Sequence, residues 1–288
     1  MRPILTLGVI LTICSVAGAQ TANLVQAELV AETKAVQAGH PFRVGLHLTI
    51  ADGWHVYWIN PGDAGAATTF KLTIPDGFTV GPVQYPVPEN LPQPGGLTVY
   101  AYEHELLLTA TVTPPTDLNG ASSIPISAAA GWCVCTPEKC VLGKAKLSLD
   151  LAVGTGRSQP DNSDLFTAWQ PRFPVSSDSS ISSTDWEMAR SARPGSALRA
   201  TVGFTWRNDP PAGNLVWLPG PSEDLIVKAG DVQTIGRVSK LSLKVLPIQG
   251  ISPTSSTFGG VLAYYVAGKP AAGVVVSIDR QKLGLPVP

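Results

Sequence analysis

The sequence is poor in charge and has no basic cluster. Of its 288 residues 14% are charged, the formal net charge is -1, and lysines and arginines do not gather into runs. Proteins that bind nucleic acid carry a concentrated basic surface, so nucleic acid is not an expected partner. A phosphate-binding glycine loop and a nucleophile-elbow serine are also missing from the sequence. Nucleotide binding and serine hydrolysis therefore have no support.

Long hydrophobic runs are missing after the N-terminus. An apolar run at residues 4–16 follows Arg2 and is shorter than the roughly 20 residues of a membrane helix. Residues 17–19 then form the Ala-Gly-Ala pattern typical of signal-peptide cleavage. We predict a signal peptide over residues 1–19, a periplasmic or secreted location, and a mature chain without a membrane span.

Cysteine and histidine are scarce and unevenly placed. The sequence holds 4 cysteines and 4 histidines, and none of them follows residue 140. Cys14 falls inside the predicted signal peptide, which leaves three cysteines in the mature chain. We therefore expect any thiol or imidazole chemistry in the first half of the protein.

Glycine and proline are abundant, with 28 and 26 residues, and they separate short runs in which apolar and polar residues alternate. The runs at residues 42–50 and 54–58 show the period of two that is typical of β-strands. Similar runs follow up to residue 151 and again from 198 to 278. The pattern predicts an all-β protein made of two antiparallel β-sandwiches.

A segment rich in glycine, proline and serine divides the two strand-rich regions. Within it, residues 163–169 have the composition of a short helix, with Asp161 or Ser163 as the N-cap and Pro171 ending it. We predict a first β-sandwich domain at 20–153, a linker with a short helix at 154–183, and a second β-sandwich domain at 184–288.

Three cysteines, Cys133, Cys135 and Cys140, lie within eight residues. A disulfide from Cys135 to Cys140 closes a six-residue loop, and so short a loop stabilises a fold by only about 2 kcal/mol. A domain of this size buries enough apolar surface to fold without such a link. The cluster therefore indicates a chemical role.

The residues alone leave three uses of this cluster open. A turn at 136–139, with Pro137 in its second position, would bring Cys135 and Cys140 together as an exchange pair or as an inert disulfide. Alternatively, all three thiolates bind Cu(I), because Cys133 and Cys135 share one face of a strand and soft ligands suit that ion. Lys139 would favour a thiolate and Glu138 would oppose it, so the sequence gives no direction for a pKa shift.

The neighbouring aromatic and histidine residues have simpler interpretations. Trp54, Tyr57 and Trp58 are expected to pack in the core of a sheet. His55 and His104 flank strands, and we expect both to face solvent rather than to bind metal.

Three segments together resemble a known family. They are residues 53–63 (Gly-Trp-His-Val-Tyr-Trp-Ile-Asn-Pro-Gly-Asp), 99–105 (Val-Tyr-Ala-Tyr-Glu-His-Glu) and 132–140 (Trp-Cys-Val-Cys-Thr-Pro-Glu-Lys-Cys). In this order they resemble the N-terminal periplasmic domain of the thiol:disulfide interchange protein DsbD. The variant most similar is that of ScsB-type, copper-tolerance-associated reductases, in the disulphide bond corrector family. The resemblance covers residues 25–153 well and the rest more weakly.

The resemblance implies an immunoglobulin-like fold and a carrier or reductase that exchanges disulfides without a cofactor. It maps the redox pair to Cys135 and Cys140, with Cys140 forming the mixed disulfide and Cys135 resolving it. Tyr100 and Tyr102 best match the aromatic cap that shields the pair and meets the partner. The implied partners are thioredoxin-fold or other periplasmic redox proteins.

Two departures from the family pattern matter. Cys133 stands where the family has an apolar residue, so it is an inert buried thiol, a third redox position or a metal ligand. The sequence also ends without the membrane segment that supplies electrons in the family. We therefore expect either another protein as the electron donor, such as a separate membrane protein, or a different use of the fold in this chain.

Overall fold

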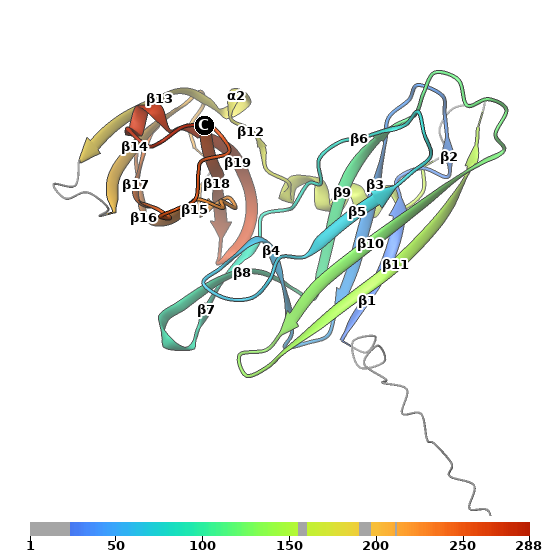
Figure 1. Ribbon diagram of the computed structural model, residues 1–288, viewed down its shortest axis with the longest axis horizontal. Helices are drawn as coiled ribbons and strands as arrows, with labels where there is room; N and C mark the ends of the chain where they lie inside the picture. The colour runs from blue at the N-terminus through green and yellow to red at the C-terminus, as the bar shows by residue number, and fades with distance from the viewer. Residues whose placement is uncertain (1–23, 155–159, 190–196, 211) are drawn as a thin grey trace, which may run out of the picture.

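The computed structural model describes residues 24–154, 160–189, 197–210 and 212–288. The predicted signal peptide lies outside these residues. Antiparallel strands make up most of the described chain, and they form two sandwiches joined by a short helical segment (Figure 1). The all-β fold predicted from the alternating pattern is therefore confirmed. No helix among the described residues combines the length and the apolar character needed to cross a membrane.

The first sandwich consists of two sheets. One has the strand order β1-β3-β9-β6 and the other β2-β11-β10-β4-β8-β7, with β5 also paired to β10. The strands are β1 (Val25–Ala31), β2 (Ala35–Val36), β3 (Phe42–Ile50), β4 (His55–Gly62), β5 (Thr69–Thr73), β6 (Thr79–Val80), β7 (Glu89–Gln93), β8 (Leu97–Glu103), β9 (Glu105–Thr113), β10 (Ser123–Cys135) and β11 (Cys140–Val153). The strands predicted at residues 42–50 and 54–58 correspond to β3 and β4.

The second sandwich also consists of two sheets, with the orders β12-β19-β18-β15 and β13-β14-β17-β16. Its strands are β12 (Val175–Ser176), β13 (Ile181–Ala189), β14 (Leu198–Trp206), β15 (Asn214–Pro219), β16 (Leu225–Ile235), β17 (Val238–Pro247), β18 (Thr257–Val266) and β19 (Lys269–Asp279). β12 and the start of β13 fall within the segment 154–183 and pair with strands of this sandwich. The domain boundaries proposed from the sequence stay predictions.

The helix predicted between the sandwiches is present as α1 (Ser163–Trp169). Its N-cap is Asn162, not Asp161 or Ser163, and Asn162 has a left-handed φ of 48°. Asparagine tolerates this conformation, and its side-chain amide donates a hydrogen bond to the carbonyl oxygen of Ala31 instead of capping the helix. The apolar face of α1 packs on the outer side of the β1-β3-β9 sheet through Phe166 and Trp169. A second helix, α2 (Ser177–Ser180), leads into β13.

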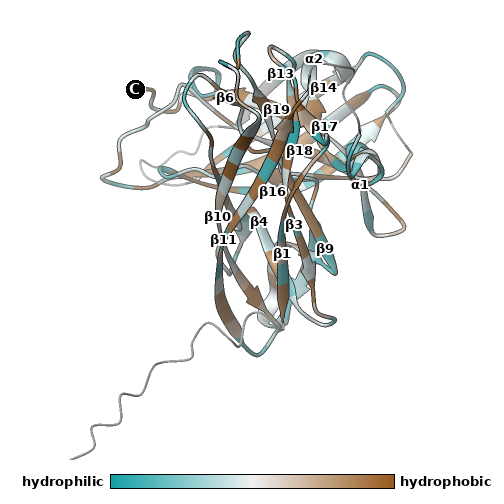
Figure 2. Ribbon diagram, turned by 90° about the vertical axis from the view of Figure 1, so that its right-hand side faces the viewer, coloured by the Kyte–Doolittle hydropathy of each residue, from teal (hydrophilic) through white to brown (hydrophobic). Residues whose placement is uncertain are grey.

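The two sandwiches share an apolar contact surface. Trp58 and Tyr102 of the first belong to the same buried cluster as Leu218, Val261 and Tyr265 of the second. Figure 1 shows β4, β7 and β8 at the border between the two bodies, and hydrophobic stretches run along β10 and β18 in Figure 2. Hydrogen bonds also connect the two sandwiches. In one of them Asn60 Nδ2 donates to the Pro219 carbonyl oxygen at 2.8 Å.

The strand β10 changes character along its length. Exposed and buried residues alternate from Ser123 to Ala130, as expected for a strand with one face in solvent. The last four residues, Trp132 to Cys135, are all buried. Both faces of the sheet are therefore covered at this end of β10.

Candidate functional site

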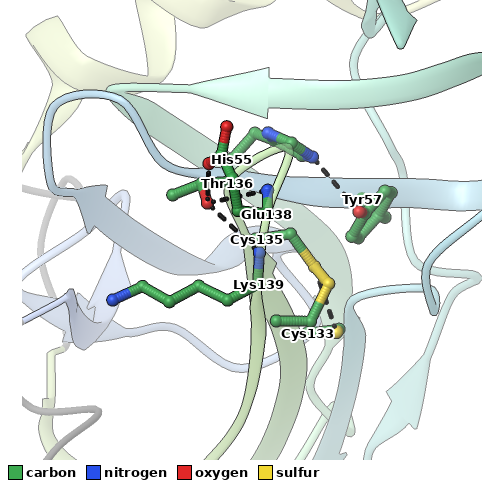
Figure 3. The surroundings of a disulfide bond; sticks show 8 residues. His55, Tyr57, Cys133, Cys135, Thr136, Glu138 and Lys139 are labelled. Carbon is green, nitrogen blue, oxygen red and sulfur yellow. Dashed lines mark hydrogen bonds between the residues drawn. A yellow bond between two sulfur atoms is a disulfide. The ribbon is translucent and has the colours of Figure 1, made fainter. Parts of the chain in front are cut away.

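The hairpin β10–β11 brings Cys135 and Cys140 together. The two residues are the last pair in register between the strands, and a disulfide bond joins them (Figure 3). The backbone N–H of Thr136 donates to the Lys139 carbonyl oxygen at 2.9 Å, which closes the loop between the cysteines. The hydroxyl oxygen of Thr136 accepts from the backbone N–H of Lys139 at 3.3 Å. The turn considered from the sequence therefore forms, and it fixes the spacing of the two sulfurs.

The two cysteines of the disulfide differ in exposure. Cys135 is 1% exposed, whereas Cys140 opens β11 in an exposed position. Thiol–disulfide exchange requires access of an attacking thiolate to a sulfur atom. Cys140 is therefore the member of the pair that a partner protein can reach.

Cys133 lies beside the disulfide as a free thiol. Its Sγ atom is 3.5 Å from Sγ of Cys135, and the residue is 7% exposed. Residues i and i+2 of a strand share a face, which explains why the two sulfurs meet. Burial raises the pKa of the Cys133 thiol, because a thiolate is poorly solvated there.

The three sulfurs form a compact group whose atoms all lie within 4.8 Å of one another. Thiolates are ligands for soft ions such as Cu(I). Two of the three sulfurs, those of Cys135 and Cys140, are bonded to each other and are not thiolates. The residues therefore fit a soft metal ion in the reduced form of the protein only.

Tyr57, Val99 and Ala101 pack with Cys133 and Cys135 in one buried cluster and form a wall beside the two cysteines. Cys135 pairs with His55 across β10 and β4, so the same register places Tyr57 beside Cys133. Ala101 pairs with Tyr57 on the far side of β4. Sequence reasoning treated Tyr57 only as a core aromatic and missed this wall, because it depends on which strands pair.

The loop after β4 lies directly on Tyr57. Gly65 has a φ of +94°, and a Cβ atom built on it would lie 2.3 Å from the Tyr57 ring. A side chain at this position would strain the backbone and displace the ring. The loop can therefore cover Tyr57 closely only because residue 65 is glycine.

His55 is buried, so the expectation that it faces solvent is wrong. It is 4% exposed, and its Nε2 atom lies 3.1 Å from the Tyr57 hydroxyl. Burial lowers the pKa of His55. The residue begins β4 at the covered end of the sheet, which a local pattern of flanking residues does not reveal. His104 does face solvent, as expected, and its Nδ1 lies 3.2 Å from Asp52.

Tyr100 and Tyr102 lie on the opposite face of β8 from the cysteines. Tyr102 is buried and donates a hydrogen bond to the Pro86 carbonyl oxygen at 2.7 Å. The Tyr100 ring meets Trp58 edge-on, with 6.1 Å between ring centroids. Alternation along β8 turns Val99 and Ala101 toward the sulfurs, so the structure does not bring the two tyrosines over the disulfide. They support β8 from the side of the second sandwich.

The charged residues of the hairpin loop are engaged elsewhere. The Lys139 ammonium lies 4.9 Å from the centroid of the Trp54 ring, and the side chain extends away from the sulfurs (Figure 3). Glu138 accepts a hydrogen bond from the Thr136 hydroxyl at 2.8 Å. From the sequence, Lys139 would favour a neighbouring thiolate and Glu138 would oppose it. In the structure each side chain instead makes a local contact, Lys139 with Trp54 and Glu138 with Thr136.

Comparison with solved structures identifies proteins of similar fold. The N-terminal periplasmic domain of ScsB from Proteus mirabilis aligns over 89% of this chain and 94% of its own, with 16% identity and a TM-score of 0.60. At this identity the likeness shows a shared fold. The reduced N-terminal domain of DsbD from Neisseria meningitidis aligns over 46% of this chain and 89% of its own, with 16% identity and a TM-score of 0.28.

Comparison with curated proteins gives no match. The family model for the N-terminal region of the thiol:disulfide interchange protein DsbD matches residues 22–152. This range contains the first sandwich, the hairpin β10–β11 and the three clustered cysteines. Over residues 22–152 the chain is thus similar to the N-terminal domains of DsbD.

Proposed function

We propose that the chain is an exported thiol–disulfide exchange protein that passes reducing equivalents to or from protein partners through Cys135 and Cys140. One observation carries this proposal: the disulfide joins an exposed residue, Cys140, to a buried one, Cys135. The arrangement gives a partner a single point of attack. The match of residues 22–152 to the family model of DsbD N-terminal domains supports the same role.

The exchange proceeds in two steps that balance in atoms and electrons. A thiolate of the partner attacks Sγ of Cys140, a sulfur–sulfur bond forms between the proteins, and the Cys135–Cys140 bond breaks. The electron pair leaves on Sγ of Cys135, which takes up a proton. A second thiolate of the partner then displaces Cys140, so that the partner leaves oxidised and the pair remains reduced. The reverse sequence reduces a partner, with Cys140 as the attacking thiolate and Cys135 as the resolving one.

The partners we propose are thioredoxin-fold or other redox proteins of the periplasm. A periplasmic location is supported by the fold shared with a periplasmic domain of ScsB. An oxidising compartment also allows a disulfide of this kind to persist between exchanges.

A trapping experiment tests the exchange role. Cys135→Ser removes the resolving thiol, so a mixed disulfide through Cys140 should accumulate with an oxidised thioredoxin-fold partner and disappear on reduction. Cys140→Ser should form no such complex, and Cys133→Ser should behave as the wild type in this assay. If the Cys135→Ser variant accumulates no complex with any periplasmic thioredoxin-fold protein, the pair is an inert disulfide.

A second candidate function is Cu(I) binding by Cys133, Cys135 and Cys140. The observation that favours it is the grouping of three sulfurs within 4.8 Å. Reduced protein titrated with Cu(I) under anaerobic conditions should then bind one equivalent, and Cys133→Ser should lose that binding. Equal affinity in the wild type and in Cys133→Ser would exclude a three-sulfur site.

A further inference from the structure

We propose that Cys133 is a third exchanging thiol, which moves the disulfide from Cys135–Cys140 to Cys133–Cys135 and thereby releases Cys140 as an exposed thiol. The proposal deepens the exchange function, because it uses the sulfurs of the same site. It assigns a reaction to the cysteine that departs from the family pattern.

The position of the sulfur atoms carries the inference. Sγ of Cys133 lies 3.5 Å from Sγ of Cys135, and the thiol is free. The shared face of β10 places both side chains in one buried cluster with Tyr57, Val99 and Ala101. The attacking thiol is therefore held beside its target, and no diffusion step is required.

The reaction is an internal exchange without net oxidation. Cys133 loses its proton, and its thiolate attacks Sγ of Cys135. The Cys133–Cys135 bond forms as the Cys135–Cys140 bond breaks, and the electron pair leaves on Sγ of Cys140. That thiolate is exposed at the start of β11 and takes up a proton from solvent. One thiol and one disulfide are present before and after the step.

Buried polar groups beside Cys133 offer a route for its proton. Tyr57 packs in the same cluster as Cys133, and its hydroxyl lies 3.1 Å from Nε2 of His55. Burial lowers the pKa of His55, so the imidazole is neutral near pH 7 and can accept a proton. Tyr57 thus shares a cluster with Cys133 and contacts an imidazole that can accept a proton.

A Cys133–Cys135 bond can form within one strand. Residues i and i+2 of a strand lie about 6.6 Å apart, at two residues of about 3.3 Å each. This separation lies within the Cα distances that a disulfide spans, near their upper end of about 6.8 Å. The structure contains the Cys135–Cys140 bond, across a Cα distance of 4.1 Å, so we take Cys133–Cys135 as the minor isomer. Because Cys133 and Cys135 are both buried, the minor isomer keeps the disulfide away from other thiols while Cys140 is free to attack.

The test uses trypsin sites that happen to separate the isomers. Cleavage after Lys71, Lys139 and Lys144 places Cys133 and Cys135 in the peptide 72–139 and Cys140 in the peptide 140–144. Oxidised full-length protein is incubated with N-ethylmaleimide under native conditions, quenched in acid, denatured and digested. The 135–140 disulfide links the two peptides, whereas the 133–135 disulfide leaves them separate.

We expect labelled Cys140 peptide to accumulate with time, together with peptide 72–139 that contains an internal disulfide. Cys133→Ser and Cys133→Ala should reduce this labelling rate at least tenfold, and Tyr57→Phe should slow it while keeping the ring in place. Label on Cys133 with the peptides still linked, or equal labelling of Cys140 in the Cys133 variants, would overturn the proposal.

A second measurement does not depend on native labelling. Reduced Cys140→Ser treated with oxidised glutathione should form the 133–135 disulfide and lose two hydrogen masses in the peptide 72–139. A product that carries only glutathione adducts would contradict the inference. Neither measurement uses a partner protein, so failure here is distinct from failure of the trapping experiment with Cys135→Ser.

Discussion

The two sandwiches differ in how a buried polar side chain is bonded. In the second, Arg280 donates two hydrogen bonds to the carboxylate of Asp224, both at 2.7 Å, in a pair that is almost completely buried. In the first, Cys133 is buried as a free thiol beside a disulfide. A buried ion pair with two hydrogen bonds is held in one arrangement, whereas a buried thiol in contact with a reactive bond is available for chemistry. The chemistry that we propose uses the thiol in the first sandwich, whereas the buried pair in the second contributes to stability.

The second sandwich also contacts the stretch of chain that leads into β7, close to the site. Its residue Tyr265 donates a hydrogen bond to the Pro88 carbonyl oxygen at 2.6 Å, just before β7. Lys269 pairs with Glu89 at 2.7 Å in the same stretch. β7 pairs with β8, whose other face forms the wall behind Cys133 and Cys135. The second sandwich therefore holds the start of β7, and β7 in turn pairs with the strand that packs against Cys133 and Cys135.

The largest expected effect comes from breaking the buried ion pair. Arg280→Met should lower the free energy of unfolding by about 3–5 kcal/mol, because it leaves the Asp224 carboxylate buried without its partner. Urea unfolding measures the change. The double variant Arg280→Met/Asp224→Leu should recover much of the loss, since it removes both charges. If the single variant is as stable as the wild type, the contrast between the two sandwiches does not hold.

Local patterns in the sequence predicted the elements that depend on near neighbours. The helix at residues 163–169, the strand at 42–50 and the turn between Cys135 and Cys140 all form. Each is decided by spacing within a few residues: helix composition, strand alternation or a proline in a turn. The wrong N-cap differs by one residue, because Asn162 is drawn to the carbonyl oxygen of Ala31.

Features that depend on strand pairing could not be predicted in the same way. The burial of His55 follows from its place between β10 and β8. Tyr100 and Tyr102 lie on the face of β8 that the second sandwich covers. The sequence alone does not show which face of β8 that is. The closeness of Cys133 to the disulfide was expected from a shared strand face, but its pocket wall required the register of β4 and β8.

A smaller effect should come from loosening the border between the sandwiches. Tyr265→Phe removes the hydrogen bond to the buried Pro88 carbonyl oxygen and should cost about 1–3 kcal/mol. Calorimetry measures the loss and shows whether the two sandwiches still unfold together. Tyr264→Phe is the matched control, because Tyr264 is also buried but packs inside the second sandwich against Trp206. Equal effects of the two substitutions would show that the border bond does not couple the sandwiches.

The smallest expected effect is a dependence of stability on pH that separates the two regions. Burial lowers the pKa of His55 below its ordinary value of about 6.5. Below that pH the unfolded chain binds a proton that the folded chain does not, so the free energy of unfolding falls as the pH drops toward the folded pKa. The slope approaches about 1.4 kcal/mol per pH unit at most. In the second sandwich the Arg280 guanidinium lowers the pKa of Asp224, so its contribution is present above about pH 4 and is lost only as the pH falls below that.

Unfolding in urea between pH 5 and pH 8 should therefore report on the first sandwich. His55→Gln should flatten the dependence in this range, because it removes the buried imidazole and keeps a polar side chain near Tyr57. His104→Asn is the matched control, since residue 104 is exposed and asparagine tolerates its left-handed φ of 62°. The control should keep the wild-type slope. A slope that survives His55→Gln unchanged would place the titrating group elsewhere and leave the imidazole without the buried, neutral state that makes it a proton acceptor beside Cys133.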